Sequence, residues 1–165
     1  MMMITERLRT DAMTVYSDGT DLVYERTFDA PRELVWNAFM HPELVPRWWG
    51  PHGTSTTVAE MDVRVGGKWR YISRAPDRND VAFFGAYVEI DPPARFTWTF
   101  LFDVEGVGEQ GGPETFTFED AGEKTKVTAR SHFSSVDEIE GALATGMIGS
   151  AVETWDRLEM LLVEG

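Results

Sequence analysis

The acidic residue best placed for acid–base chemistry is Glu89, at the end of the aromatic-rich segment 81–90. A carboxyl group buried among aromatic side chains has a raised pKa, and such a group can serve as a general acid or base. The alternative is a carboxylate at a strand end that pairs with Arg70 or Arg95. Alternation alone leaves the direction of Glu89 open, because either the odd or the even residues of this segment could face the interior.

Histidine is the second source of candidate chemistry, and the chain has three. His132 ends the last expected strand, where it could orient a polar ligand group or act in acid–base catalysis; a histidine at a sheet edge is the alternative. His41 and His52 have no partners at metal-ligand spacing, so we expect no metal site. Gly66-Gly67 lacks the Lys-Ser/Thr pair of a phosphate loop, so we expect no nucleotide and no other cofactor.

Aromatic side chains recur in phase along the central segments of the chain, most regularly over 96–102. If they share one face of a sheet, they line an apolar pocket with methionines as adaptable walls. The alternative is a plain hydrophobic core, which uses the same residue types. The candidate ligand-binding residues are Trp49, Met61, Trp69, Tyr71, Phe83, Tyr87, Glu89, Trp98, Phe100, His132, Met147, Ala151 and Trp155.

Six or seven β-strands must position these side chains. Segment 22–28 is rich in β-formers, and alternation over 54–65 predicts a strand with Thr57, Ala59 and Met61 on one face. Gly66-Gly67 marks a hairpin turn. The remaining strands are expected at 68–74, 81–90, 94–102, 114–119 and 124–133, and the glycine-rich segment 103–113 is predicted as a long mobile loop.

Two short helices are expected directly after the first strand. The first begins near Pro31 and ends at His41-Pro42, and the second runs from Pro42 to about Trp48.

The C-terminal segment predicts one long helix. Ser135 and Glu138 have the spacing of a capping box, and apolar residues at helical spacing follow to the end of the chain. Gly141, Gly146 and Gly149 each cost about 1 kcal/mol relative to Ala inside a helix. They indicate close contact with the sheet, a bend, or space for a ligand.

This order of elements predicts an α+β helix-grip fold, in which a curved antiparallel sheet wraps around the C-terminal helix. Residues 1–20 are interpreted as an N-terminal appendage or a short extra strand, and residues 21–165 as a single ligand-binding domain. A curved sheet that grips a helix leaves a cavity between them, which is the main functional indication in the sequence.

Composition excludes several classes of protein. The 165 residues are 42% hydrophobic and 12% aromatic, which is enough for a globular core. The formal net charge of −13, without a basic cluster, excludes a nucleic-acid surface. The chain has no cysteine, so it has no disulfide framework. The N-terminus lacks the apolar core of a signal peptide, and no apolar segment is long enough to span a membrane; we expect a cytoplasmic protein.

Four segments together resemble a known family: ERTFDAPRELVWNAF…HPELVPRWWGP, EMDVRVGGKWRY, FGAYVEIDPPARFTW and ATGM…ETWDRLEMLL. They are similar to the activators of the heat-shock-protein-90 ATPase, in the small bacterial single-domain branch of the START-like, birch-pollen-allergen-like (SRPBCC) superfamily. The resemblance spans residues 22–163. It implies the helix-grip fold and directs Tyr87 and Glu89 inward. The chain departs from the pattern at Ser150, where a glycine is usual, and the departure bears on helix packing near the pocket.

The resemblance implies a ligand-binding cavity rather than an ATPase. We expect a small hydrophobic or aromatic ligand, oriented by Glu89, His132 and Arg70, with homodimerisation left open. One alternative is a cyclase- or hydrolase-like enzyme that uses a pocket carboxylate or histidine. The other is a protein-interaction module similar to a co-chaperone, which needs an exposed apolar patch.

Overall fold

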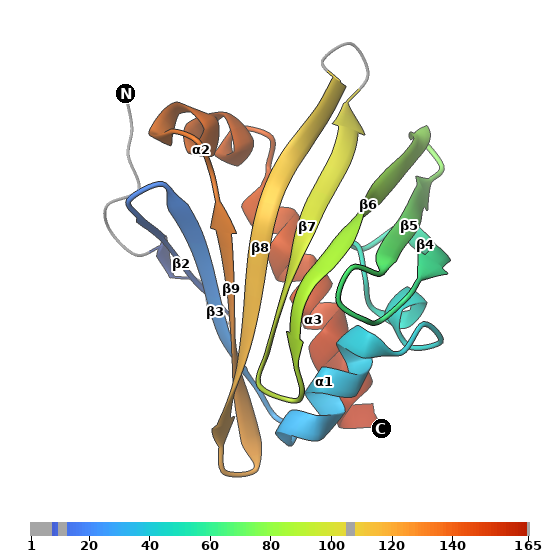
Figure 1. Ribbon diagram of the computed structural model, residues 1–165, viewed down its shortest axis with the longest axis vertical. Helices are drawn as coiled ribbons and strands as arrows, with labels where there is room; N and C mark the ends of the chain where they lie inside the picture. Colours follow the sequence, from blue (N-terminus) through green and yellow to red (C-terminus); the bar gives the residue numbers. More distant parts are fainter. Residues whose placement is uncertain (1–7, 10–12, 105–107, 165) are drawn as a thin grey trace.

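The computed structural model describes residues 8–9, 13–104 and 108–164 and contains one curved antiparallel sheet packed against a C-terminal helix. Figure 1 shows α3 (Met147–Glu164) running diagonally across the sheet, with α1 (Arg32–Met40) beside its C-terminal half. This is the expected α+β helix-grip architecture.

The sheet has nine strands within the described residues, in the order β1-β2-β3-β9-β8-β7-β6-β5-β4. Their bounds are β1 Leu8–Arg9, β2 Thr14–Asp18, β3 Asp21–Phe28, β4 Ser55–Met61, β5 Lys68–Ala75, β6 Arg78–Asp91, β7 Arg95–Val104, β8 Gly108–Ala121 and β9 Lys124–His132.

The strand count exceeds the expected six or seven because the N-terminal segment contributes two. Strands β3 to β9 account for seven, and β2 pairs with β3 from Thr14 opposite Glu25 to Asp18 opposite Asp21. Residues 14–18 therefore form the extra strand that was one alternative for this segment, and Val15 is 1% exposed. Residues 1–7 and 10–12 lie outside the described part of the chain, and the domain division at residue 20 stays a prediction.

The two short helices are confirmed as α1 and the 3-10 helix η1 (Val45–Arg47). The prediction of one long C-terminal helix is wrong, because α2 (Val136–Leu143) and α3 are separate. Gly146 separates them with a φ of +84°, a conformation that helices use at their C-terminal ends. The Ser135 cap is confirmed, since its side chain accepts a hydrogen bond from the Glu138 N–H at 3.2 Å.

Two β-bulges change which residues face the concave side of the sheet. The register of β4 shifts between Val58 and Glu60, so Thr56 is buried and Thr57 and Ala59 are exposed, opposite to the prediction. The register of β6 shifts between Tyr87 and Glu89. A bulge inserts one extra residue, and the alternation therefore reverses beyond it.

The predicted loop 103–113 is largely strand. Asp103 pairs with Glu109 and Val104 with Gly108, so β7 and β8 form a long hairpin. Gly111 makes this pairing possible: its φ is +118°, and a Cβ there would lie 2.0 Å from the Phe100 carbonyl oxygen. The tip, residues 105–107, is outside the described residues.

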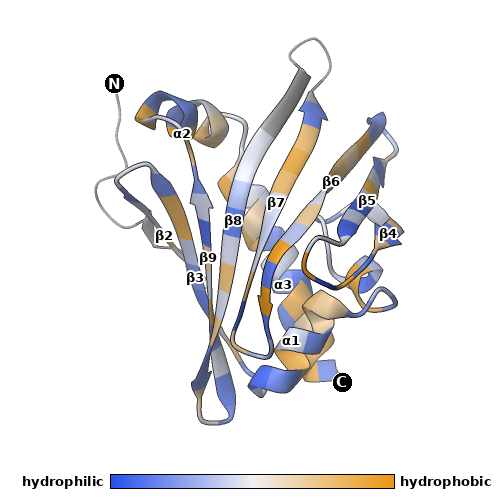
Figure 2. Cartoon of the chain, viewed as in Figure 1, coloured by the Kyte–Doolittle hydropathy of each residue, from blue (hydrophilic) through white to orange (hydrophobic). Residues whose placement is uncertain are grey.

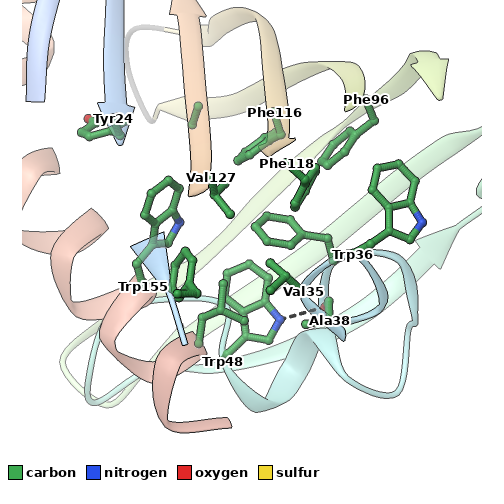
Figure 3. Packing of buried hydrophobic residues seen from close by; sticks show 14 of the residues in the cluster. Tyr24, Val35, Trp36, Ala38, Trp48, Phe96, Phe116, Phe118, Val127 and Trp155 are labelled. Atoms are coloured by element: carbon green, nitrogen blue, oxygen red, sulfur yellow. Dashed lines mark hydrogen bonds between the residues drawn. The ribbon is translucent and has the colours of Figure 1, made fainter. Parts of the chain in front are cut away.

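The hydrophobic core lies between the concave face of the sheet, α1 and α3. Figure 2 shows hydrophobic residues along β6, β7 and the helices that cover them. Figure 3 shows the part beside α1, where Trp36 packs edge-on against Phe118 at 5.3 Å between ring centroids. Aromatic rings thus continue from this end of the core onto the concave face of the sheet, which packs against α3.

Candidate functional site

The concave face of β5, β6 and β7 carries a continuous aromatic cluster. Trp69 stacks on Trp98 with ring centroids 4.0 Å apart, and Tyr71 lies 4.8 Å from Trp69. Tyr87 adds a third strand to this cluster at 6.0 Å from Trp98. All four side chains are less than 5% exposed. The predicted common face of these residues is therefore present.

A cavity of about 50 Å³ lies between this cluster and α3. Four of the candidate ligand-binding residues line it: Trp49, Tyr71, Trp98 and Trp155. Five further lining residues were not among the candidates: Phe39, Val45, Trp48, Phe116 and Thr154. The volume is that of one or a few water molecules.

Trp49 is held at the cavity by the segment that follows η1. Its carbonyl oxygen accepts a hydrogen bond from Thr56 Oγ1 at 2.7 Å, and its ring lies 5.3 Å from Tyr71. Arg157 of α3 donates to the carbonyl oxygen of Gly50 at 2.8 Å. Both the sheet and α3 therefore fix the position of this indole.

Trp48 also lines the cavity, and it has a structural role. It is 2% exposed, and its indole N–H donates to the Ala38 carbonyl oxygen at 2.9 Å (Figure 3). The adjacent tryptophans thus have different partners: Trp48 joins the end of η1 to α1, while Trp49 reaches the sheet.

The remaining apolar candidates surround the cavity without lining it. Trp69 and Tyr87 are buried beneath it in the sheet, whereas the others are only partly buried and pack against the core. These partly buried side chains are Met61, Phe83, Phe100, Met147 and Ala151. Phe83 and Phe100 both contact Trp49, at 4.8 and 6.5 Å between ring centroids. The aromatic surface therefore continues from the cavity toward more accessible rings.

Glu89 does not face the interior, contrary to the expectation from the family resemblance. The bulge beyond Tyr87 turns it to the outer face, where it pairs with Arg95 at 3.0 Å and its side chain is 47% exposed. Ile90 takes the inward position and packs against the core. The alternative of a strand-end ion pair is correct for Glu89.

His132 and Arg70 also lie away from the cavity. The His132 side chain is 61% exposed, and its Nδ1 lies 2.8 Å from Oδ1 of Asp21. Arg70 is exposed, with its guanidinium 5.3 Å from the Phe84 ring. None of the three groups expected to orient a ligand is positioned to do so.

The carboxylate that does face the concave side is Glu114 of β8. It lies between Trp98 of β7 and Ser131 of β9 in the strand register. The Trp98 indole N–H and the Ser131 hydroxyl each donate to it at 2.9 Å. Burial raises the pKa of Glu114 above its ordinary value, although the two hydrogen bonds act in the opposite direction.

Glu114 could have been found from the sequence. It shares its phase with Phe116 and Phe118, both of which are buried, and the alternation over 114–118 has no bulge. A carboxylate in the same alternating phase as two phenylalanines indicates a side chain that faces the core.

Tyr24 contributes a second polar group to the same side. Its ring packs edge-on against Trp155 at 6.4 Å, and its buried hydroxyl has no hydrogen-bond partner among the described residues. Burial, together with the nearby charge of Glu114, raises the pKa of Tyr24.

A second depression of about 260 Å³ lies outside the sheet–helix interior, beside η1 and the C-terminal half of α3. Arg47, His52 and Arg157 line it together with Glu164. Within the described ranges, no group of three histidine, aspartate or glutamate side chains could hold a metal ion. None of the helices in that part of the chain is long and apolar enough to cross a membrane.

Comparison with solved structures shows the same fold in several bacterial proteins. Protein Ms6760 from Mycobacterium smegmatis is 23% identical with a TM-score of 0.82, covering 96% of this chain and 99% of that one. A protein from Rhodobacter sphaeroides is 22% identical with a TM-score of 0.84, covering 94% and 100%. One from Staphylococcus epidermidis is 28% identical with a TM-score of 0.73, covering 91% and 93%.

No curated protein matches the chain. A family model does match, over residues 29–162, and it describes the "Activator of Hsp90 ATPase homolog 1-like protein". The match covers α1, η1, strands β4 to β9, α2 and most of α3, and so includes the aromatic cluster and Glu114. The chain belongs to the family of Activator of Hsp90 ATPase homolog 1-like proteins.

Proposed function

We propose that the protein binds a small hydrophobic or aromatic molecule between the concave face of the sheet and α3. The observation that carries this proposal is the cavity at that interface, walled by aromatic rings from both the sheet and α3. Proteins with this START-like fold commonly bind hydrophobic ligands at the corresponding interface.

The ligand displaces side chains on entry. Pockets for small molecules usually measure about 300–1,000 Å³, and the cavity of about 50 Å³ is far smaller. The partly buried Phe83, Phe100 and Met147 adjoin the cavity and have the most freedom to move. Methionine is unbranched and adapts readily to a new neighbour.

Native mass spectrometry of the purified protein, followed by a thermal-shift screen of lipids and aromatic metabolites, tests this function. A ligand that binds the folded state raises Tm, by an amount that corresponds to about 2.7 kcal/mol at one hundred times its Kd. A retained mass or a rise in Tm supports the proposal. The absence of both across a broad panel contradicts the proposal and favours the alternative that these residues form only a hydrophobic core.

A substitution that fills the cavity separates ligand binding from general stability. Thr154 lines the cavity from α3 and is half-buried, so Thr154→Leu places apolar volume there. Filling about 50 Å³ of cavity stabilises by about 1 kcal/mol at about 24 cal/mol per Å³. We expect a higher midpoint in urea unfolding and weaker binding of any ligand found in the screen.

The matched control is Thr145→Leu, in the exposed connection between α2 and α3. It should leave ligand affinity unchanged. Equal ligand affinity in Thr154→Leu and the parent would place the ligand elsewhere.

The enzyme alternative loses the two groups on which it depended. Glu89 and His132 are both exposed and lie outside the core. Glu89 pairs with Arg95, and His132 lies against Asp21. A carboxylate that does contact the cavity wall is that of Glu114, which accepts a hydrogen bond from Trp98.

A further inference from the structure

We propose that the ligand carries a protonated amino group and that Glu114 is its anchor. The inference rests on the proposed ligand cavity and adds the chemical class of the molecule that occupies it: an apolar or aromatic body with one cationic amine. Three features of the concave face support it, namely an uncompensated carboxylate, a buried hydroxyl without a partner, and walls made of aromatic rings.

Within the described part of the chain, the carboxylate of Glu114 has neutral hydrogen-bond donors and no cationic partner. Its two oxygens accept one hydrogen bond each, from Trp98 and Ser131. A carboxylate offers about four acceptor positions, so two remain for a ligand. Glu114 is partly buried; a charge partly withdrawn from water without a counter-ion is costly, and a bound ammonium group would relieve that cost.

The neighbouring basic residues are already paired with other carboxylates. On β9, Lys126 pairs with Glu25 at 3.1 Å and Arg130 with Asp21 at 2.8 Å, both on the opposite face from Ser131. On β3, Arg26 pairs with Asp156 of α3 at 2.7 Å. Among the residues that the structure describes, no Lys, Arg or His forms an ion pair with Glu114, and a cationic ligand would supply the counter-ion that these residues do not.

Tyr24 supplies an acceptor on the same side of the cavity. Its hydroxyl is buried without a partner among the described residues, and Tyr24 pairs with Ala129 of β9, the strand that lies between β3 and the β8 strand of Glu114. An ammonium group has three N–H donors. Glu114 has acceptor positions for two of them, and the Tyr24 hydroxyl offers a further acceptor on the same face of the sheet.

The cavity wall connects both polar groups to the apolar site. Trp98 lines the cavity and donates to Glu114, while Trp155 lines it from α3 and packs against Tyr24. Tyr71 and Trp49 complete an aromatic wall. The faces of such rings attract cations, most strongly where water is excluded. Aromatic walls with a single carboxylate therefore favour a cation over a neutral or anionic ligand.

The test compares three molecules of one shape: 2-phenylethylamine, 2-phenylethanol and ethylbenzene. Binding to the full chain is measured near neutral pH by native mass spectrometry and by intrinsic tryptophan fluorescence. We expect the amine to bind at least about tenfold more tightly than the alcohol, and ethylbenzene to bind no more tightly than the alcohol.

Glu114→Gln is the decisive variant, because the amide keeps the size of the side chain and can still accept from Trp98. We expect it to remove the advantage of the amine and to leave the affinity for the alcohol within about twofold. Glu119→Gln, at an exposed position of the same strand, makes the same change in net charge and should retain the full preference.

The indole N–H signal of Trp98 in a ¹H–¹⁵N NMR spectrum reports directly on the anchor. The amine should shift this signal in the parent protein more than 2-phenylethanol does, and in Glu114→Gln the two molecules should shift it equally.

The outcomes separate the two proposals. Equal binding of amine and alcohol, or an amine preference that survives Glu114→Gln, overturns the amine inference while the binding function stands. If none of the three molecules binds and the broader screen also finds no ligand, both proposals fail.

Discussion

Glu114 and Glu89 show how much a single residue's surroundings decide its chemistry. Both are carboxylates on adjacent parts of the sheet, yet Glu89 meets Arg95 in solvent and Glu114 meets an indole and a hydroxyl inside. The exposed ion pair contributes at most about 1 kcal/mol. The carboxylate of Glu114 is partly buried, and this burial raises its pKa above the ordinary 4.5.

The pH dependence of stability should therefore reveal Glu114. A carboxyl group whose pKa is higher in the folded than in the unfolded protein stabilises the fold while it is protonated, and this contribution is lost as the pH rises through the folded-state pKa. We expect Glu114→Gln to match the parent in urea unfolding at acidic pH and to become the more stable of the two as the pH rises above the ordinary glutamate range.

For Asp21, the same experiment should show the opposite dependence of stability on pH. Its hydrogen bonds from Arg130 and His132 outweigh burial and lower its pKa, so its contribution is present at neutral pH and is lost as the pH falls through that lowered value. Asp21→Asn should destabilise near neutral pH by about 1–2 kcal/mol and lose this effect in acid. A parallel shift of both variants at every pH would show that neither carboxyl group titrates as proposed.

At the scale of the elements, the break between α2 and α3 and the bulge in β6 determine the shape of the site. Gly146 ends the first helical segment in a left-handed conformation, and the bulge after Tyr87 replaces Glu89 by Ile90 on the inner face. Gly141 and Gly149 have no neighbour within 4 Å of an added Cβ. Close packing against the sheet therefore does not explain these glycines, and Ser150 is likewise exposed rather than directed at the cavity.

Two alanine substitutions distinguish the observed helix pair from a continuous helix. Gly149→Ala, within α3 and in open space, should stabilise by about 1 kcal/mol. Gly146→Ala, at φ +84°, should destabilise by about 1–2 kcal/mol, because an L residue is strained there. Urea unfolding midpoints provide the measurement. Stabilisation by both substitutions would indicate that one helix continues through residue 146.

At the scale of the whole molecule, α3 is attached by adjacent residues to two parts of the fold that are distant in the sequence. Arg26 of β3 pairs with Asp156, and Arg157 donates to the carbonyl oxygens of Gly50 and Pro51 at 2.8 and 3.3 Å. The second contact joins α3 to the segment that carries Trp49, so the cavity and this end of the molecule are stabilised together.

Arg157→Met should therefore weaken the fold and loosen Trp49. Losing a charged donor to two carbonyl oxygens costs about 1.5–3 kcal/mol. Increased quenching of tryptophan fluorescence by acrylamide would report the exposure of Trp49. Arg47→Met, an exposed arginine beside the same depression, is the control and should change stability by less than about 0.5 kcal/mol. Equal effects of the two substitutions would argue against a specific role for Arg157.

The sequence by itself determined the fold class, the inward phase of Trp69, Tyr71, Trp98 and Phe100, and the Ser135 helix cap. Each of these follows from local periodicity or from side-chain to backbone contacts within a few residues. Some of the residues that line the cavity could be predicted in the same way, because inward aromatic residues on neighbouring strands had to share one face.

Only the tertiary structure decided which carboxylate lies inside and how much space the aromatic residues leave. The residue inserted at the bulge reverses the alternation of β6, so Glu89 faces outward. No local sequence pattern predicts this insertion. The volume of about 50 Å³ depends on how rings from α1, β5, β7, β8, α3 and the segment after η1 pack together. Core and pocket are built from the same side chains, so their distinction arises only when segments distant in the sequence meet.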